Sequence, residues 1–145
     1  MFRYFLSEEA SALGLALRAP RPLDAGFDLP SLEEVTIEPL EQARLRTGIH
    51  IAVPEGWVAL VRDRSSVALR GGVTVAGVID SAYRGEVQVL MYNLSAEPLS
   101  FKVGERIAQL VVVPHLPGTD CEEVSSLAEL GDTQRGEGGF GSTGA

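Results

Sequence analysis

Seven short runs rich in valine, isoleucine and other strand-forming residues recur at close spacing along this chain. In residues 86–89 and 99–103 the apolar side chains fall at every second position, which is the period of a strand buried on one face. Turn-forming segments such as 54–56 and 104–105 separate the runs. Many short strands without a long helical period predict an all-β domain: a sandwich, jelly roll or barrel. The predicted strands are residues 35–37, 48–53, 57–61, 73–79, 86–92, 99–103 and 106–113.

Two short segments predict single helical turns: residues 65–70, and residues 125–130, where Ser126 and Glu129 have the spacing of a capping box. After Leu130 the composition changes, because six of the last fifteen residues are glycine and no periodicity remains. We therefore expect a β domain over residues 1–130 and a flexible arm over residues 131–145. Spaced functional side chains in the arm favour a lid that orders over a ligand, and a disordered end is the alternative.

The last eleven residues, RGEGGFGSTGA, partly match two phosphate-binding fingerprints. Gly136, Gly138 and Gly141 satisfy G-x-G-x-x-G, whereas Ser142 stands where a P-loop has its lysine. Both fingerprints need a strand before the loop and a helix after it. We therefore predict neither a dinucleotide-binding fold nor a P-loop fold. Glycines beside an arginine are nevertheless suited to binding a phosphate group.

Composition excludes several classes of function. The net charge of −8, from 12 basic and 20 acidic residues, argues against a nucleic-acid surface. No apolar run approaches the roughly 18 residues of a membrane span, and we expect no secretory signal. A single cysteine, Cys121, excludes an internal disulfide and fits a reducing, cytoplasmic location. An acidic chain that binds phosphate must use local arginines, backbone amides and a divalent cation.

Four further stretches carry side chains suited to chemistry. Asp28 stands between apolar residues in A-G-F-D-L, where a turn cap is the simpler interpretation. Arg64 precedes two serines, which suits phosphate oxygens as well as a solvated turn. Asp80 ends a strand near Tyr83, as in a general base beside a stacking platform or an ordinary hairpin turn. Gln109 lies between apolar neighbours and faces either solvent or a site.

Other catalytic classes are not supported by the sequence. His50, His115 and Cys121 are isolated, so no metal-ligand spacing is present. A serine hydrolase is unsupported because the chain has no G-x-S-x-G elbow.

The order of these stretches resembles a known family. A-G-F-D-L, R-S-S, G-V-I-D-x-x-Y-R-G-E, G-E-R-I-A-Q-L and R-G-x-G-G-F-G-S-T-G are similar, in order, to the five motifs of the homotrimeric deoxyuridine triphosphatases (dUTPases). The resemblance runs from about Leu23 to Gly144. It implies a jelly-roll (β-clip) subunit in a homotrimer with shared active sites. Each site would hydrolyse dUTP to dUMP and pyrophosphate with Mg²⁺, keeping uracil out of DNA and supplying dUMP for dTMP synthesis.

The resemblance also implies a role for each motif residue. Asp80 would activate the water that attacks the α-phosphorus, Tyr83 would stack under the deoxyribose, and Asp28 would hold Mg²⁺ through waters. Uracil would lie against residues 73–79, and the arm would cover the nucleotide. The remaining implied substrate-binding residues are Thr74, Gly77, Val78, Ile79 and Gln88 for the nucleoside, Arg64, Ser65, Ser66 and Gln109 for the phosphates, and Arg135, Phe140, Gly141, Ser142 and Thr143 in the arm.

Three departures from the family pattern bear on specificity. Ser66 replaces a glycine, Thr74 replaces the pocket asparagine, and the stretch between Arg70 and Gly77 is shortened. R-S-S also occurs in dCTP deaminases, which share the fold, but their deaminating glutamate would fall near Leu90, where no acid is present. The alternative is a broader deoxynucleoside triphosphate pyrophosphatase, which the shortened stretch allows, or a dCTP-deaminase-like relative of the same fold. A non-catalytic β trimer is disfavoured because Asp80, Tyr83 and the arm motif are all present.

Overall fold

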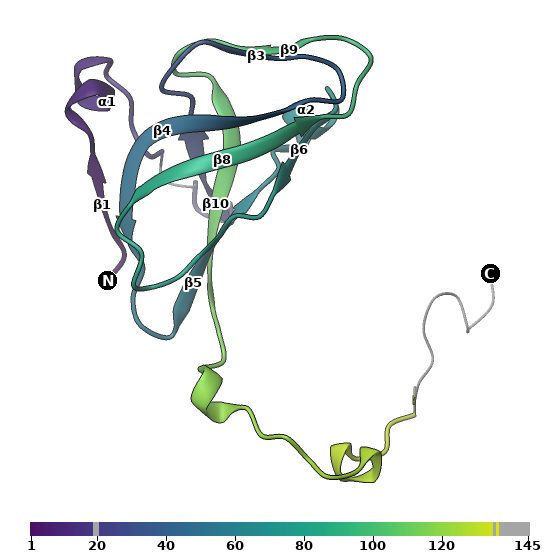
Figure 1. The fold of residues 1–145 in the computed structure, drawn as a ribbon. Helices are drawn as coiled ribbons and strands as arrows, with labels where there is room; N and C mark the ends of the chain where they lie inside the picture. The colour runs from purple at the N-terminus through teal and green to yellow at the C-terminus, as the bar shows by residue number, and fades with distance from the viewer. Residues whose placement is uncertain (19–20, 135, 137–145) are drawn as a thin grey trace. The chain divides into compact units, whose positions relative to one another are not determined.

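Two four-stranded sheets, A and B, pack against each other around the hydrophobic core, and a two-stranded sheet C adjoins them (Figure 1). The structure, a computed structural model of the protein, describes residues 1–18, 21–134 and 136. Every pairing between its named strands is antiparallel, which confirms the predicted all-β class. Sheet A has the order β1 (Arg3–Leu6), β4 (Gln42–Ala52), β8 (Glu86–Asn93) and β6 (Gly72–Val75); sheet B has β2 (Gly26–Pro30), β10 (Arg106–Pro114), β5 (Trp57–Arg62) and β7 (Val78–Ile79); sheet C pairs β3 (Val35–Ile37) with β9 (Leu99–Phe101).

All seven predicted strands are confirmed, although several differ in extent: the run 99–103 ends at Phe101 in β9, and two other runs change more. The run 48–53 is the second half of the longer β4, and the run 73–79 is divided into β6 and β7. The sequence patterns did not predict β1, the helix α1 (Glu8–Ala12) or β2. The predicted turn after residue 65 is confirmed as helix α2 (Ser65–Ala68), whose Val67 is buried.

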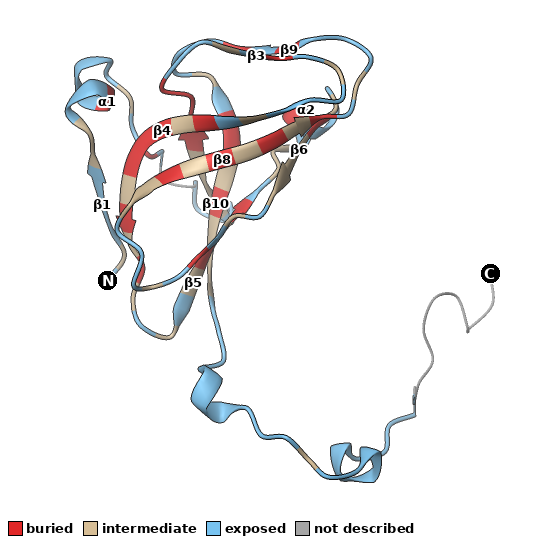
Figure 2. Cartoon of the chain, in the orientation of Figure 1, coloured by how far each residue is buried: buried red, intermediate tan, exposed pale blue. Residues whose placement is uncertain are grey.

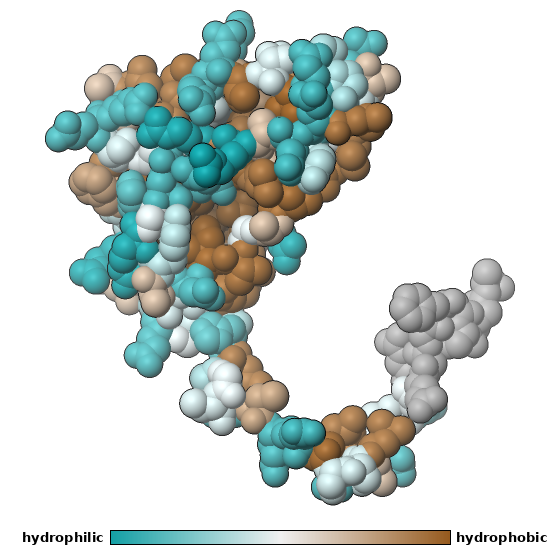
Figure 3. Space-filling view, in the orientation of Figure 1, coloured by the Kyte–Doolittle hydropathy of each residue, from teal (hydrophilic) through white to brown (hydrophobic). Residues whose placement is uncertain are grey.

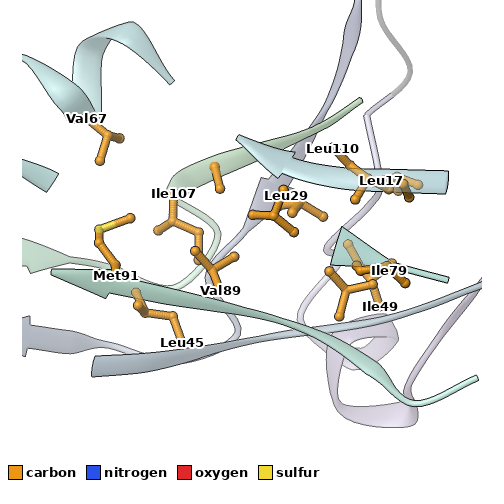
Figure 4. Packing of buried hydrophobic residues seen from close by; sticks show 14 of the residues in the cluster. Leu17, Leu29, Leu45, Ile49, Val67, Ile79, Val89, Met91, Ile107 and Leu110 are labelled. Atoms are coloured by element: carbon orange, nitrogen blue, oxygen red, sulfur yellow. The ribbon is translucent and has the colours of Figure 1, made fainter. Parts of the chain in front are cut away.

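The core follows from the period-two pattern of the strands. Along β8, Val87, Val89 and Met91 are buried while their neighbours are partly exposed, and Figure 2 shows the same alternation in red and tan. Figure 4 shows Leu45 and Met91 on one side of the core and Leu29, Ile107 and Leu110 on the other. Burying one such side chain stabilises the fold by about 1.5–3 kcal/mol, so the two sheets hold each other in place.

The chain divides into two compact units, Met1–His115 and Leu116–Ala145. All residues of the buried hydrophobic cluster belong to the first unit. The second unit contains two short 3-10 turns, η1 (Gly118–Asp120) and η2 (Leu127–Leu130), the latter at the predicted helical turn. Hydrogen bonds from the Ser125 and Ser126 hydroxyls to the Glu129 carboxylate lower the pKa of that carboxyl. No helix in the described residues is long and apolar enough to cross a membrane.

A half-buried carboxylate, that of Glu86, stabilises an irregularity between β4 and β8. The register of the two strands shifts between Arg46 and His50, and the freed amides of Thr47 and Gly48 donate to Glu86 Oε1 at 3.0 and 2.8 Å. Arg46 Nε donates to Glu86 Oε2 at 3.3 Å. Burial raises the pKa of Glu86, but the hydrogen bonds from Gly48, Arg46 and Thr47 outweigh it, so the pKa is lowered overall. The ionised carboxylate therefore holds the bulge.

Replacing Glu86 by Gln should lower the free energy of unfolding at pH 7 by about 1–2 kcal/mol, because the charge-assisted hydrogen bonds are weakened. Since the folded-state pKa of Glu86 is lowered, the wild-type advantage is present above the ordinary carboxyl pKa of about 4.3 and is lost as the pH falls through the folded value. Urea unfolding at a series of pH values tests this, with the exposed Glu55→Gln as control. A Glu86→Gln effect that stays constant down to about pH 3 contradicts the assignment.

Candidate active site

A cavity of about 570 Å³, which we call the arginine cavity, opens beside β2 and β10. Four arginines and two aspartates line it, so positive charge predominates in an otherwise acidic chain. Such a concentration of guanidinium groups favours a polyanionic ligand. The charged lining residues are Arg18, Arg21, Arg64, Arg106, Asp24 and Asp28.

Strand register brings the charged groups of this cavity together. Gln109 on β10 lies opposite Asp28 on β2 and opposite Arg62, the last residue of β5, and Arg64 comes two residues later. Arg64 Nε donates to Asp28 Oδ1 at 2.8 Å, and Arg106 Nη1 donates to Asp28 Oδ2 at 3.0 Å. Asp28 therefore lies within a strand between two arginines, and its interpretation as a turn cap is wrong.

Two other predicted phosphate-binding residues line the arginine cavity, and one does not. Ser65 begins α2, and Gln109 projects from β10. The side-chain amide of Gln109 donates to the main-chain oxygen of Asp63 at 2.8 Å, which ties β10 to the loop before α2. Ser66 is exposed and is not part of the lining. The structure thus unites Asp28, Arg64, Ser65 and Gln109.

A second cavity, of about 220 Å³, lies between β7 and β8, and we call it the tyrosine cavity. Asp80 and Tyr83 line it together with Gln88 of β8, so these three predicted residues also come together. Asp80 is exposed and follows directly after β7. The other lining residues are Gly77, Val78, Ile79, Glu86 and Val87.

The turn between β7 and β8 fixes the Tyr83 ring. The Tyr83 main-chain amide donates to the Asp80 main-chain oxygen at 3.1 Å. The Tyr83 hydroxyl donates to the Glu86 main-chain oxygen at 2.9 Å. The ring lies so close to Gly85 that a Cβ there would collide with its hydroxyl end. Glycine in R-G-E is therefore required by the packing of the tyrosine.

The β6–β7 turn places backbone groups at the tyrosine cavity. Ala76 and Gly77 both have positive φ, 58° and 85°, which breaks the predicted continuous strand. The Gly77 oxygen accepts from the Val61 amide at 2.8 Å, so the turn is tied to β5. Thr74, which is predicted to bind the nucleoside, is not among the residues that line this cavity; its hydroxyl and amide both donate to Asp63.

The described parts of the two cavities share no lining residue. The predicted arm residues Arg135, Phe140, Gly141, Ser142 and Thr143 lie outside the described residues. Sequence reasoning missed Arg106 and Asp63 as site residues. Arg106 was visible within G-E-R-I-A-Q-L, whereas nothing in the sequence indicated that Asp63 would contact Thr74.

A family model described as dUTPase matches residues 15–144. A deoxyuridine 5'-triphosphate nucleotidohydrolase of Corynebacterium jeikeium is 48% identical over 131 residues, which cover 88% of this chain and 84% of that protein. The enzyme of the same name from Candida albicans is 44% identical over 146 residues, covering 94% and 91% of the two chains. The structure of a mutant Staphylococcus bacteriophage 80alpha dUTPase with dUpNHpp matches with a TM-score of 0.84 at 28% identity, covering 100% and 99%.

Replacing Asp28 by Asn should tighten the binding of inorganic pyrophosphate without divalent cations by roughly fivefold, because both arginines lose their neutralising partner. Isothermal titration calorimetry measures this affinity. Asp24→Asn is the matched control, because it removes the same charge from the same cavity without touching Arg64 or Arg106. An equal gain in both variants, or no gain in Asp28→Asn, contradicts the paired arrangement.

Proposed function

This chain belongs to the dUTPase family and is an enzyme that hydrolyses dUTP, and on that premise we propose how its residues perform the reaction. Water attacks the α-phosphorus, the bond to the β-phosphate oxygen breaks, and dUMP and pyrophosphate are released. The observation that carries the proposal is the pairing of an arginine-rich cavity with a separate cavity that joins Asp80 to Tyr83. The reaction removes dUTP as a source of uracil in DNA and supplies dUMP for dTMP synthesis.

The tyrosine cavity binds the nucleoside. The Tyr83 ring, held by its hydroxyl at 2.9 Å from the Glu86 oxygen, lies under the deoxyribose and excludes a 2′-hydroxyl. Backbone donors and acceptors of Gly77, Val78 and Ile79 select uracil, because cytosine would leave buried polar groups unpaired. Gln88 projects from β8 beside them.

The arginine cavity binds the triphosphate. Arg64 offers a planar fork of donors, and the Ser65 hydroxyl and the Gln109 side-chain amide add hydrogen bonds to phosphate oxygens, whereas Ser66 lies outside the lining. Phosphoryl transfer depends on charge neutralisation and positioning more than on covalent chemistry. An excess of arginines at this position therefore supplies the main requirement of the reaction.

Asp80 positions and activates the attacking water. A carboxylate oxygen accepts a hydrogen bond from water and can hold that water in line with the α-phosphorus. The exposed place of Asp80 at the end of β7, beside Tyr83, allows it to face the α-phosphorus of a nucleotide bound there. We assign this residue roughly 10²–10⁴-fold of the rate enhancement.

Asp28 suits Mg²⁺ that arrives with the nucleotide. A carboxylate has about four acceptor positions, of which Arg64 and Arg106 use one on each oxygen, so positions remain for metal-bound waters. The described residues contain no group of three or more His, Cys, Asp or Glu arranged to hold a metal. One carboxylate plus substrate phosphates is the ligand set typical of Mg²⁺. When bound, the ion neutralises phosphate charge.

The arm residues complete the proposed site. The family match extends to residue 144 and so includes them. Arg135 binds the γ-phosphate, Phe140 covers the uracil with about 1–3 kcal/mol of stacking, and Gly141, Ser142 and Thr143 surround the terminal phosphates.

We place each active site between copies of the chain in a homotrimer. The two cavities share no described lining residue, which fits a site assembled from different copies. The outer face of sheet B is also apolar, since Leu60 lies opposite both Val111 and Val78, and Val58 lies opposite Val113. Figure 3 shows apolar side chains at the surface over β6 and, below it in this view, over β5 and β10. Contiguous exposed apolar surface favours assembly.

Mixed trimers test both the assigned roles and the shared site. Asp80→Asn and Arg64→Ala should each release pyrophosphate from dUTP at least about 100-fold more slowly than the wild type. Co-expression of the two variants should restore up to about a quarter of wild-type activity, because only a copy interface with intact Asp80 on one side and intact Arg64 on the other is complete. Differently tagged chains allow the mixed trimers to be isolated.

Co-expression of Asp80→Asn with an Asp80→Ala chain is the control, and it should stay inactive. Recovery only in the first mixture supports the shared site. If the mixed trimers are as inactive as the two single variants, Asp80 and Arg64 of each site belong to one copy, which contradicts the proposal. A monomer with full activity contradicts it as well.

A further inference from the structure

We propose that Asp63 and Thr74 form a brace that positions Arg64 for the triphosphate, so that Thr74 serves the phosphate side of the reaction. The inference deepens the proposed function and rests on it. Asp63 Oδ1 accepts two hydrogen bonds from Thr74, one from its amide and one from its hydroxyl, both at 2.6 Å. Two donors of one residue thus converge on a single carboxylate oxygen.

The brace joins elements of different sheets. Asp63 follows β5 of sheet B, and Thr74 lies in β6, the edge strand of sheet A. Residue 74 pairs with Met91 of β8 on its other side, so β6 is anchored to the body of sheet A. The short charge-assisted bonds therefore tie the end of β5 to a fixed point.

The main chain of Asp63 is fixed as well. The Asp63 main-chain oxygen accepts a hydrogen bond from the Gln109 side-chain amide at 2.8 Å. Asp63 is therefore also bound to β10, the strand beside the arginine cavity. With its carboxylate and its carbonyl both engaged, Asp63 has little freedom to rotate, and the residue that follows is Arg64. The Arg64 guanidinium donates to Asp28 and to the Arg106 oxygen, at 2.8 and 3.3 Å.

Thr74 is thereby committed away from the nucleoside. Its hydroxyl is used by Asp63, and it is not among the residues that line the tyrosine cavity. Base selection then depends on the backbone at Gly77, Val78 and Ile79, and Thr74 is a positioning residue that acts through Asp63 on Arg64.

Thr74→Val keeps the side-chain shape and removes the hydroxyl. We expect kcat/KM for dUTP to fall about tenfold and the affinity for inorganic pyrophosphate to weaken several-fold, since a hydrogen bond to a charged group is lost. The ratio of kcat/KM for dUTP to that for dCTP, and the inhibition constant of deoxyuridine, which carries no phosphate, should change less than about twofold. Thr74→Ser should restore kcat/KM, and adding Thr74→Val to Asp63→Ala should cause no further loss.

Thr36→Val is the matched control, because Thr36 makes a comparable strand hydroxyl contact, to Ser100 at 2.8 Å, and lines neither cavity. It should retain wild-type kcat/KM at a temperature where all variants remain folded. If Thr74→Val changes the dUTP-to-dCTP ratio of kcat/KM or the binding of deoxyuridine, Thr74 contacts the base and the brace is wrong. If the variant leaves both the kinetics and the pyrophosphate affinity unchanged, the brace is also wrong. If the wild type does not hydrolyse dUTP, the proposed function fails, and the pyrophosphate affinities still decide the brace.

Discussion

The position of β10 between β2 and β5 is the constraint on which the rest of the site depends. Gln109 faces Asp28 across one strand pairing and Arg62 across the other. This register brings three charged side chains together at sheet B. They are Asp28 of β2, Arg64 just after β5, and Arg106 at the start of β10. A shift of one residue along β10 would exchange core and surface side chains, because the side-chain period of a strand is two. The buried Ile107, Ala108 and Leu110 therefore secure the charged groups beside them.

Local charge, not net charge, lets an acidic protein bind a polyanion. The chain carries −8 overall, yet four arginines line the arginine cavity. Asp28 neutralises part of that charge without a ligand, which limits repulsion between Arg64 and Arg106. A nucleotide that brings its own divalent cation supplies positive charge for the same carboxylate. The arrangement thus matches the metal-bound nucleotide better than a bare anion.

Periodic elements of the fold were predictable from the sequence, and contacts between distant elements were not. The alternation in β8 predicted its buried face correctly, because burial on one face imposes that pattern. β2 was missed because Gly26 and Pro30 occupy its two ends, which leaves only three residues to carry a strand pattern. The Asp28–Arg64 and Asp28–Arg106 pairs arise from strand register over separations of 36 and 78 residues, which composition does not reveal.

Motif order nevertheless placed Asp80, Tyr83 and Gln88 together. The Thr74–Asp63 contact was not predictable, because a hydroxyl near a pocket gives no sign that a neighbouring loop will engage it.

The central claim is that a small cavity with Tyr83 and backbone groups selects the deoxyuridine nucleoside while a separate arginine cavity binds its phosphates. The most direct measurement compares pyrophosphate release from dUTP, dCTP, dTTP and UTP by the full chain with Mg²⁺. The account predicts a kcat/KM for dUTP at least about 100-fold above that for each of the others, because a mismatched base or a 2′-hydroxyl leaves buried groups unpaired or in collision. Comparable values for all four nucleotides would contradict it.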